Sequence, residues 1–152
     1  LLNMKKADNR GFSLGELVVV IAIMAVLIGV MAPTFIKNVE KSRESVDVQT
    51  LDTVRQSVVT ALSTEHVYSQ YVTVVDETTP YVTYMDNINN ENTNLDKELR
   101  KEVDSDGILN AQFKSKACKD AKIKITIFYG SKVKVEAEGA GTTKSNINMV
   151  VE

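Results

Sequence analysis

The chain has 152 residues, a formal net charge of −2 and 43% hydrophobic residues. Its basic residues are dispersed, which gives no electrostatic footprint for nucleic acid. The single cysteine, Cys118, excludes an intramolecular disulfide and a cysteine-rich metal site, and we expect it to be a small buried hydrophobe. The single histidine, His66, leaves no multi-histidine metal site. With no convergent nucleophile and base in the sequence, we expect neither an enzyme nor a cofactor.

The apolar residues are concentrated near the N-terminus. The sixteen residues Leu17–Ala32 carry no polar side chain, and continuing to Ile36 gives the roughly 20 residues that span a bilayer. Three basic residues precede this stretch, whereas Lys37 is the first to follow it. The positive-inside tendency therefore predicts a cytoplasmic N-terminus and an external C-terminal domain. The upstream basic residues are Lys5, Lys6 and Arg10.

A cleaved secretory signal peptide or a plain uncleaved anchor would share this basic and apolar pattern. Two features oppose the signal peptide. Glu16 lies at the beginning of the apolar stretch, where a carboxylate costs roughly 2 to 3 kcal/mol on entering hydrocarbon. The usual A-x-A cleavage pattern is also missing, since Val30-Met31-Ala32 runs directly into Pro33.

Glu16 needs a partner, because ionisable groups at membrane depth are usually paired and functional. No cation lies at a helical spacing from it in the sequence, and Arg10 is six residues away. A cut between Gly11 and Phe12 would create an α-amino group at the same membrane depth. A neighbouring subunit could then present that amine to Glu16.

The stretch Arg10–Glu16 (RGFSLGE), running directly into the apolar helix, resembles the processing signal of type IV pilins and pseudopilins. The resemblance implies that a membrane aspartyl protease removes a leader within residues 1–11, starting at Met4, and methylates the new N-terminal Phe12. It implies that Glu16 is the family's assembly glutamate and that Pro33 kinks the helix. Ser13 and Gly15 depart from the commonest residues of the family, but neither belongs to the cut bond.

The resemblance further implies a structural subunit of a helical surface filament, without catalytic residues or metal. It implies a prepilin peptidase, an assembly ATPase, a platform protein and further copies of the chain as partners, and a route from the bacterial membrane to the cell surface. A minor pilin or a secretion-system pseudopilin is the nearest alternative. A monomeric membrane-tethered binding module is an alternative from a different class.

Beyond Pro33 the sequence becomes amphipathic at helical spacing, which predicts that the helix continues to Leu62. The apolar positions of this part are Ile36, Val39, Val46, Leu51, Val54, Val58 and Leu62. We interpret the charged residues Glu40, Lys41, Arg43 and Glu44 as a solvated face.

After Leu62 the pattern changes. Tyr71–Val75 and Tyr81–Met85 are rich in β-branched and aromatic residues and predict short strands. Asp86–Asn94 is very polar and predicts a surface loop, with Asn94 capping a helix from Leu95 to about Val103 that stops at Asp104–Gly107.

The clearest strands are Lys122–Phe128 and Lys132–Glu138, where apolar and charged residues alternate. A three-residue turn is expected to place Tyr129, Ile127 and Ile125 opposite Val133, Val135 and Ala137. We expect Gly139–Asn146 to be a loop and Ile147–Val151 to be a final edge strand.

These elements predict an α+β fold, in which a long N-terminal helix packs on a small antiparallel sheet. The expected divisions are a leader (1–11), a transmembrane and assembly helix (12–36), its amphipathic continuation (37–63) and a head domain (64–152). Asp104–Gly107 lacks the glutamate of a calcium loop and is interpreted as a helix stop. The head-domain tyrosines are interpreted as packing residues; they are Tyr68, Tyr71, Tyr81 and Tyr84.

Overall fold

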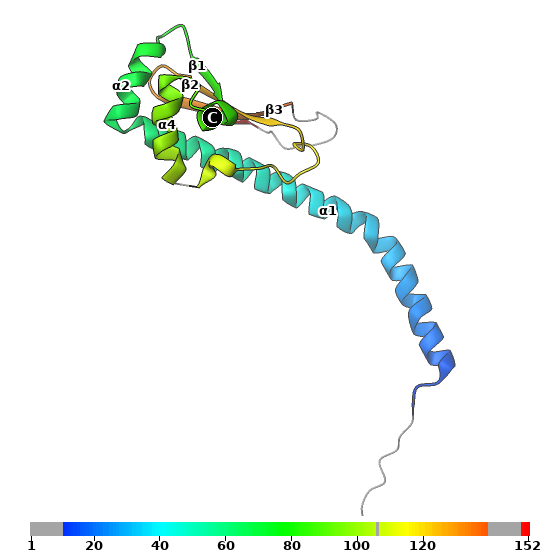
Figure 1. The fold of residues 1–152 in the computed structure, drawn as a ribbon. Helices are drawn as coiled ribbons and strands as arrows, with labels where there is room; N and C mark the ends of the chain where they lie inside the picture. Colours follow the sequence, from blue (N-terminus) through cyan, green and yellow to red (C-terminus); the bar gives the residue numbers. More distant parts are fainter. Residues whose placement is uncertain (1–10, 106, 140–149) are drawn as a thin grey trace, which may run out of the picture. The chain divides into compact units, whose positions relative to one another are not determined.

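The computed structural model describes residues 11–105, 107–139 and 150–152 (Figure 1). These residues divide into two compact units, one ending at Asn38 and one beginning at Val39. Helix α1 (Leu14–Leu62) begins in the first unit and ends in the second. The α+β fold expected from the sequence is confirmed, since the second unit adds short helices and an antiparallel sheet.

The described part of the first unit is the apolar half of α1 and the three residues before it. Every residue from Gly11 to Asn38 is exposed. The predicted helix is confirmed and continues through Pro33, although proline offers no backbone N–H to the preceding turn. The kink at Pro33 stays a prediction.

The second half of α1 contributes one apolar stripe to the core of the second unit. Leu51, Val54, Val58 and Leu62 are buried at spacings of three or four residues, as expected for one face of a helix. The buried stripe is shorter than the sequence predicts, because Val46, one of its expected members, is 36% exposed.

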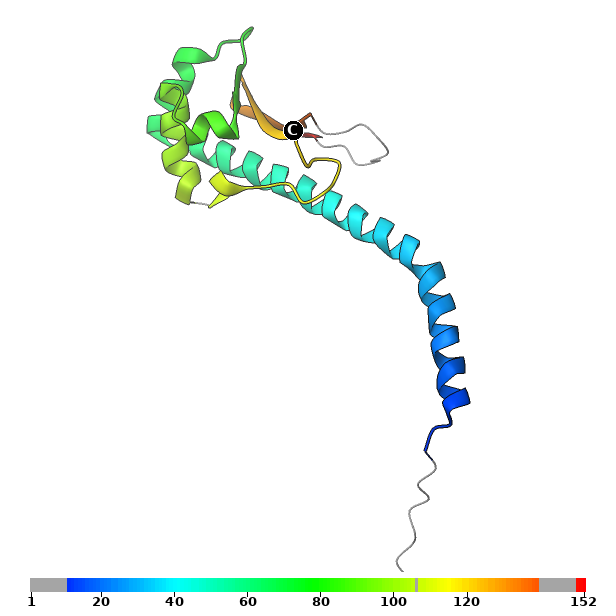
Figure 2. The same ribbon diagram turned by 45° about the vertical axis from the view of Figure 1, so that its right-hand side comes forward.

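Among the described residues, the sheet has four antiparallel strands in the order β1-β2-β3-β4. They are β1 (Tyr81–Tyr84), β2 (Lys122–Phe128), β3 (Lys132–Glu138) and β4 (Val150–Val151). Ile125, Ile127 and Val135 lie fully buried in the same core as the α1 stripe. Figures 1 and 2 show the sheet lying along the second half of α1.

The bounds of β2 and β3 agree with the prediction, but the predicted register is wrong by two residues. Ile127 lies opposite Val133, Ile125 opposite Val135 and Ile123 opposite Ala137. A shift by two keeps the same side chains on the core face, so the apolar pattern alone could not distinguish the two registers. The turn is three residues long, as expected, with Gly130 and Ser131 at positive φ.

The predicted strand Tyr71–Val75 is wrong, because helix α2 (Glu65–Val74) occupies this segment. Val67, Tyr71 and Val75 are buried at spacings of four, which is a helical period that begins before the β-branched run. Tertiary packing thus overrides local β propensity here. Tyr71, expected to pack on the sheet, reaches it from this helix.

The predicted loop Asp86–Asn94 is also wrong in its first part, where the short helix α3 (Met85–Asn89) forms. Met85 and Ile88 anchor α3, and Ile88 is fully buried. Helix α4 (Asn94–Ser105) confirms the next predicted helix, but Thr93 rather than Asn94 is its cap, since the Asp96 N–H donates to the Thr93 hydroxyl at 3.1 Å.

The helix stop predicted at Asp104–Gly107 agrees with the end of α4 at Ser105. Gly107 follows with φ of 69°, and the 3₁₀ helix η1 (Ile108–Asn110) comes next. The end of the predicted final strand Ile147–Val151 forms β4 (Val150–Val151), which pairs with β3. Residues 147–149 and most of the predicted loop Gly139–Asn146 lie outside the described residues.

Asp47 and Asp96 are acids that lie buried among the described residues, and the sequence pattern indicates neither; Asp47 makes the longer-range contact. It lies on α1 with no exposed surface, and its carboxylate accepts the N–H groups of Lys114 (2.7 Å) and Ser115 (2.9 Å). Glu40, predicted to lie on a solvated face, accepts the N–H of Lys116. Two carboxylates of α1 therefore hold three successive amides of the segment between η1 and β2.

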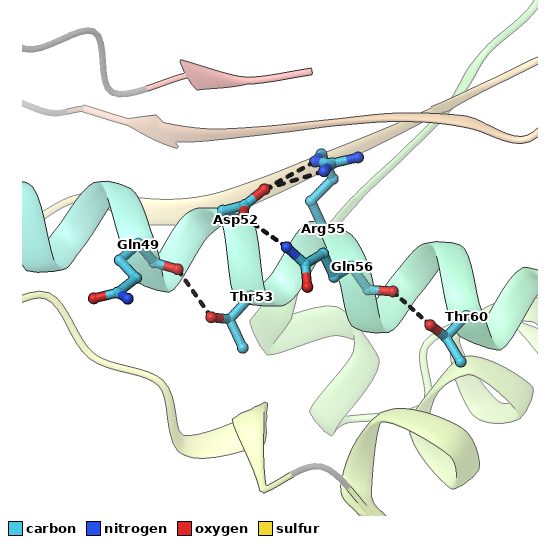
Figure 3. Close-up of polar contacts among 6 residues, drawn as sticks. All are labelled: Gln49, Asp52, Thr53, Arg55, Gln56 and Thr60. Carbon is cyan, nitrogen blue, oxygen red and sulfur yellow. Dashed lines mark hydrogen bonds and ion pairs between the residues drawn. The ribbon is translucent and has the colours of Figure 1, made fainter.

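A second set of polar contacts on α1 stays on the helix surface. Asp52 accepts hydrogen bonds from Arg55 (3.1 Å) and Gln56 (2.7 Å), as Figure 3 shows. Thr53 and Thr60 each donate to a carbonyl four residues earlier. These contacts are local, whereas the Asp47 contacts join distant parts of the chain.

Candidate functional site

Of the sequence-predicted site residues, Gly11, Phe12 and Glu16 lie at or just before the beginning of α1, whereas Pro33 lies within it. Gly11, Phe12 and Ser13 precede the helix without regular secondary structure, and Phe12 is 86% exposed. A Cβ added at Gly11 would meet no atom within 4 Å, so the fold itself places no steric demand for glycine there. The Gly11–Phe12 peptide bond is therefore accessible, and a requirement for glycine would come from a protein that acts on this bond.

The first turn of α1 forms a reciprocal capping arrangement. The backbone N–H of Ser13 donates to the Glu16 carboxylate at 2.8 Å, and the backbone N–H of Glu16 donates to the Ser13 hydroxyl at 3.2 Å. This is a capping box, which satisfies two amides that the helix start would otherwise leave unpaired. The capping box places the Glu16 carboxylate beside Ser13, the residue that follows Phe12.

This internal contact differs from the prediction, in which a cation was the expected partner of Glu16. Within residues 11–105, no cation pairs with Glu16. The signal was present in the spacing Ser-x-x-Glu, which is typical of a helix start. Ser13, treated as a neutral departure from the family, is thus the residue that positions Glu16.

The apolar side chains that follow Glu16 are all exposed. Among the large apolar side chains, the exposed fractions run from 46% at Val20 to 71% at Val30. This part of α1 is long and apolar enough to cross a membrane, by length and composition. A surface of this size is typical of a membrane or protein contact rather than of a free soluble helix.

The second unit contains the single histidine and the single cysteine of the chain. No group of three or more metal-ligating side chains is present in the described ranges. His66 is exposed, and Cys118 is fully buried as predicted, with burial raising the pKa of its thiol.

The tyrosines make separate contacts rather than one ligand platform. Tyr71 donates to the Phe128 carbonyl at 3.0 Å, whereas Tyr84 donates to Glu138 at 2.7 Å. The Tyr81 hydroxyl lies 2.5 Å from the Thr93 hydroxyl, at hydrogen-bond distance. Burial raises the pKa of Tyr81, and the hydrogen bond to Glu138 raises that of Tyr84.

Comparison with known proteins places the resemblance on the same segment. Residues 6–32 match the family model of the prokaryotic N-terminal methylation motif. Neither the search of curated proteins nor that of solved structures found a match. The match covers the Gly11–Phe12 bond, Glu16 and most of the exposed apolar stretch. The chain therefore carries the prepilin-type signal of type IV pilins and pseudopilins, with its long apolar transmembrane helix, and this signal points to a structural subunit rather than to an enzyme family.

Proposed function

We propose that this chain is the structural subunit of a type IV pilus-like filament, processed between Gly11 and Phe12 and assembled through the apolar half of α1. The observation that carries the proposal is the methylation motif at residues 6–32, which ends in the apolar half of α1, where no side chain is buried. The accessible peptide bond after Gly11 supports processing by a prepilin peptidase.

Cleavage would give Phe12 a new α-amino group, which the peptidase then methylates. The Ser13–Glu16 contact supports a defined position for the Glu16 carboxylate, which accepts the N–H of Ser13, the residue next to that amine. In the proposed filament, the amine of one subunit pairs with Glu16 of its neighbour. Because removing one member of a buried ion pair costs about 3 to 5 kcal/mol, this pairing would fix the axial register of the subunits.

The exposed apolar helices pack against each other in the core of the filament, where they are removed from lipid and water. Each subunit presents different surfaces to the subunits on its two sides, so the assembly is heterologous and extends without closing. The membrane stores the precursor, with its N-terminus in the cytoplasm. An assembly ATPase and a platform protein are the partners that this route requires.

The test is the variant Glu16→Leu, expressed as the sole subunit. It inserts and is cleaved, because neither step needs the carboxylate, but its filament yield by electron microscopy falls to a small fraction of normal. The matched control is Val19→Leu, which changes an exposed apolar side chain one turn away and no charge; its filament yield is normal. Normal yield from Glu16→Leu would contradict the assembly role.

A further inference from the structure

A cleft of about 520 Å³ lies in the second unit, away from the motif at the start of α1. It is formed by the end of β1, helix α3, the segment after η1 and the start of β2. This volume falls within the range of roughly 300 to 1,000 Å³ that is typical of small-molecule sites. The cleft thus has the size of a binding site that the filament proposal does not use.

Small side chains and fixed loops keep the cleft open. Ala111 and Ala121 line it and leave space that larger residues would fill. The Asn89 side-chain amide donates to the Leu109 carbonyl at 3.1 Å, which ties α3 to η1 across the cleft. The Asp47 carboxylate holds the adjoining segment at Ser115. A cleft held by such contacts loses little conformational entropy when a ligand binds.

Three residues with side-chain amides line the cleft, namely Asn89, Asn110 and Gln112. Asn110 and Gln112 are exposed, and within the described ranges their side chains make no hydrogen bond to another residue. An amide offers both donors and an acceptor, which matches hydroxyl groups that also donate and accept. This chemistry favours a ligand rich in hydroxyl groups over an apolar one.

The charges at the cleft favour an acidic ligand. Lys119 and Lys122 face a single acid, Asp86, in the lining. The Lys122 ammonium lies 3.8 Å from the Asp86 carboxylate, and both side chains are 67% exposed, so this pair is weak. Lys119 has no ion pair with any residue of the described chain. One ligand carboxylate would therefore find a cation that the fold leaves available.

Two aromatic rings complete the lining. The hydroxyl of Tyr84 is engaged by Glu138, which leaves the ring as its contribution to the cleft. Phe113 is half-buried against the core. An aromatic ring offers an apolar face, and the C–H face of a sugar ring is the matching surface on a hydroxyl-rich molecule.

We propose that this cleft binds an acidic saccharide, with Lys119 as the cation for its carboxylate and Asn110 and Gln112 as hydrogen-bonding partners for its hydroxyl groups. The proposal does not depend on cleavage at Gly11 or on filament assembly. A subunit carrying this site would bring saccharide recognition to the external domain.

The experiment is calorimetric titration of the full chain in detergent micelles with a hyaluronan tetrasaccharide, which carries glucuronate. Fully N-acetylated chitotetraose, a neutral saccharide of the same length, is titrated in parallel. The acidic probe binds at least about tenfold more tightly than the neutral one, as expected for one charge-assisted contact. Equal binding of the two probes, or no binding of either at about 10 mM, would overturn the proposal.

Two variants place the binding in the cleft. Ala121→Leu fills the hollow, and Lys119→Glu reverses the cation at an exposed position that the fold tolerates. Each weakens the acidic probe by about tenfold or more. The control is Lys97→Glu, an equal charge change at an exposed position of α4 outside the lining. Equal loss in the control would show non-specific attraction and reject the site.

Discussion

The Asp47 carboxylate accepts the backbone N–H of Ser115 at 2.9 Å, which joins α1 to a segment 68 residues later in the chain. The same carboxylate accepts the Lys114 N–H, and the Asp47 side chain is fully buried. The acid thus substitutes for the strand or helix partner that these amides lack. This contact fixes the segment that borders the cleft proposed to bind a saccharide.

Removal of that acid should destabilise the second unit strongly. Asp47→Ala leaves two amides without their acceptor, and we expect a loss of about 2 to 4 kcal/mol in the free energy of unfolding. Urea unfolding followed by tyrosine fluorescence measures it, because all five tyrosines lie beyond Val39. The control is Asp52→Ala, whose partners are local and whose loss should stay below about 1 kcal/mol. Equal losses would contradict the role of Asp47.

The Ser13 hydroxyl should determine the stability of the first turn of α1. Ser13→Ala removes the acceptor of the Glu16 N–H, and we expect a loss of about 1 kcal/mol at the helix start. Amide hydrogen exchange of Glu16 in detergent micelles should then become about five times faster. Ser13→Thr keeps the hydroxyl and should keep the slow exchange. Unchanged exchange in Ser13→Ala would mean that the cap does not form in solution.

The Tyr71 hydroxyl joins α2 to the turn between β2 and β3. It donates to the Phe128 carbonyl and accepts the Ser131 N–H at 3.1 Å. Tyr71→Phe loses both bonds and should lower the free energy of unfolding by about 1 to 2 kcal/mol. Tyr68→Phe is the control, since Tyr68 is half exposed and the described residues offer its hydroxyl no partner. If the two variants unfold alike, the bridging role is wrong.

The pH dependence of stability should include a contribution from Glu138. The hydrogen bond from Tyr84, followed by the one from Lys124, holds the pKa of Glu138 below its ordinary value of 4.5. A lowered acid pKa stabilises the fold above the ordinary value, and this stabilisation is lost as the pH falls through the folded value.

The variant Glu138→Gln tests this contribution. At pH 7 it should unfold at a lower temperature than the unmodified chain, and the difference should disappear as the pH falls well below 4.5. Melting temperatures across the acid range measure the difference. A difference that stays constant with pH would show that the charge of Glu138 contributes nothing.

Much of the architecture could be predicted from repeating patterns. The apolar run defines the first half of α1, and the alternation of apolar and charged residues predicts the bounds of β2 and β3. Local propensity failed at Tyr71–Val75, where burial at Val67 and Tyr71 imposes a helix. Such packing depends on residues distant in the sequence, which a local pattern does not contain.

The same distinction between local patterns and distant contacts applies to the candidate site. The Gly11–Phe12 bond follows from the resemblance of Arg10–Glu16 to the pilin processing signal and stays a prediction, whereas the isolated acid Glu16 is evident from the sequence itself. The Ser-x-x-Glu spacing also indicates the capping contact between Ser13 and Glu16, although this contact was not among the predictions. The partners of Asp47 could not be predicted, because a lone aspartate on a helix gives no indication of amides almost 70 residues away.

In the proposed filament, cleavage after Gly11 exposes the amine that pairs with Glu16. Intact mass and N-terminal fragmentation of the mature protein, purified from the cell that makes it, show where the mature chain begins. We expect a chain that begins at Phe12 and carries one methyl group on its α-amine. A chain that retains Met4, or begins at any residue other than Phe12, would exclude the proposed pairing.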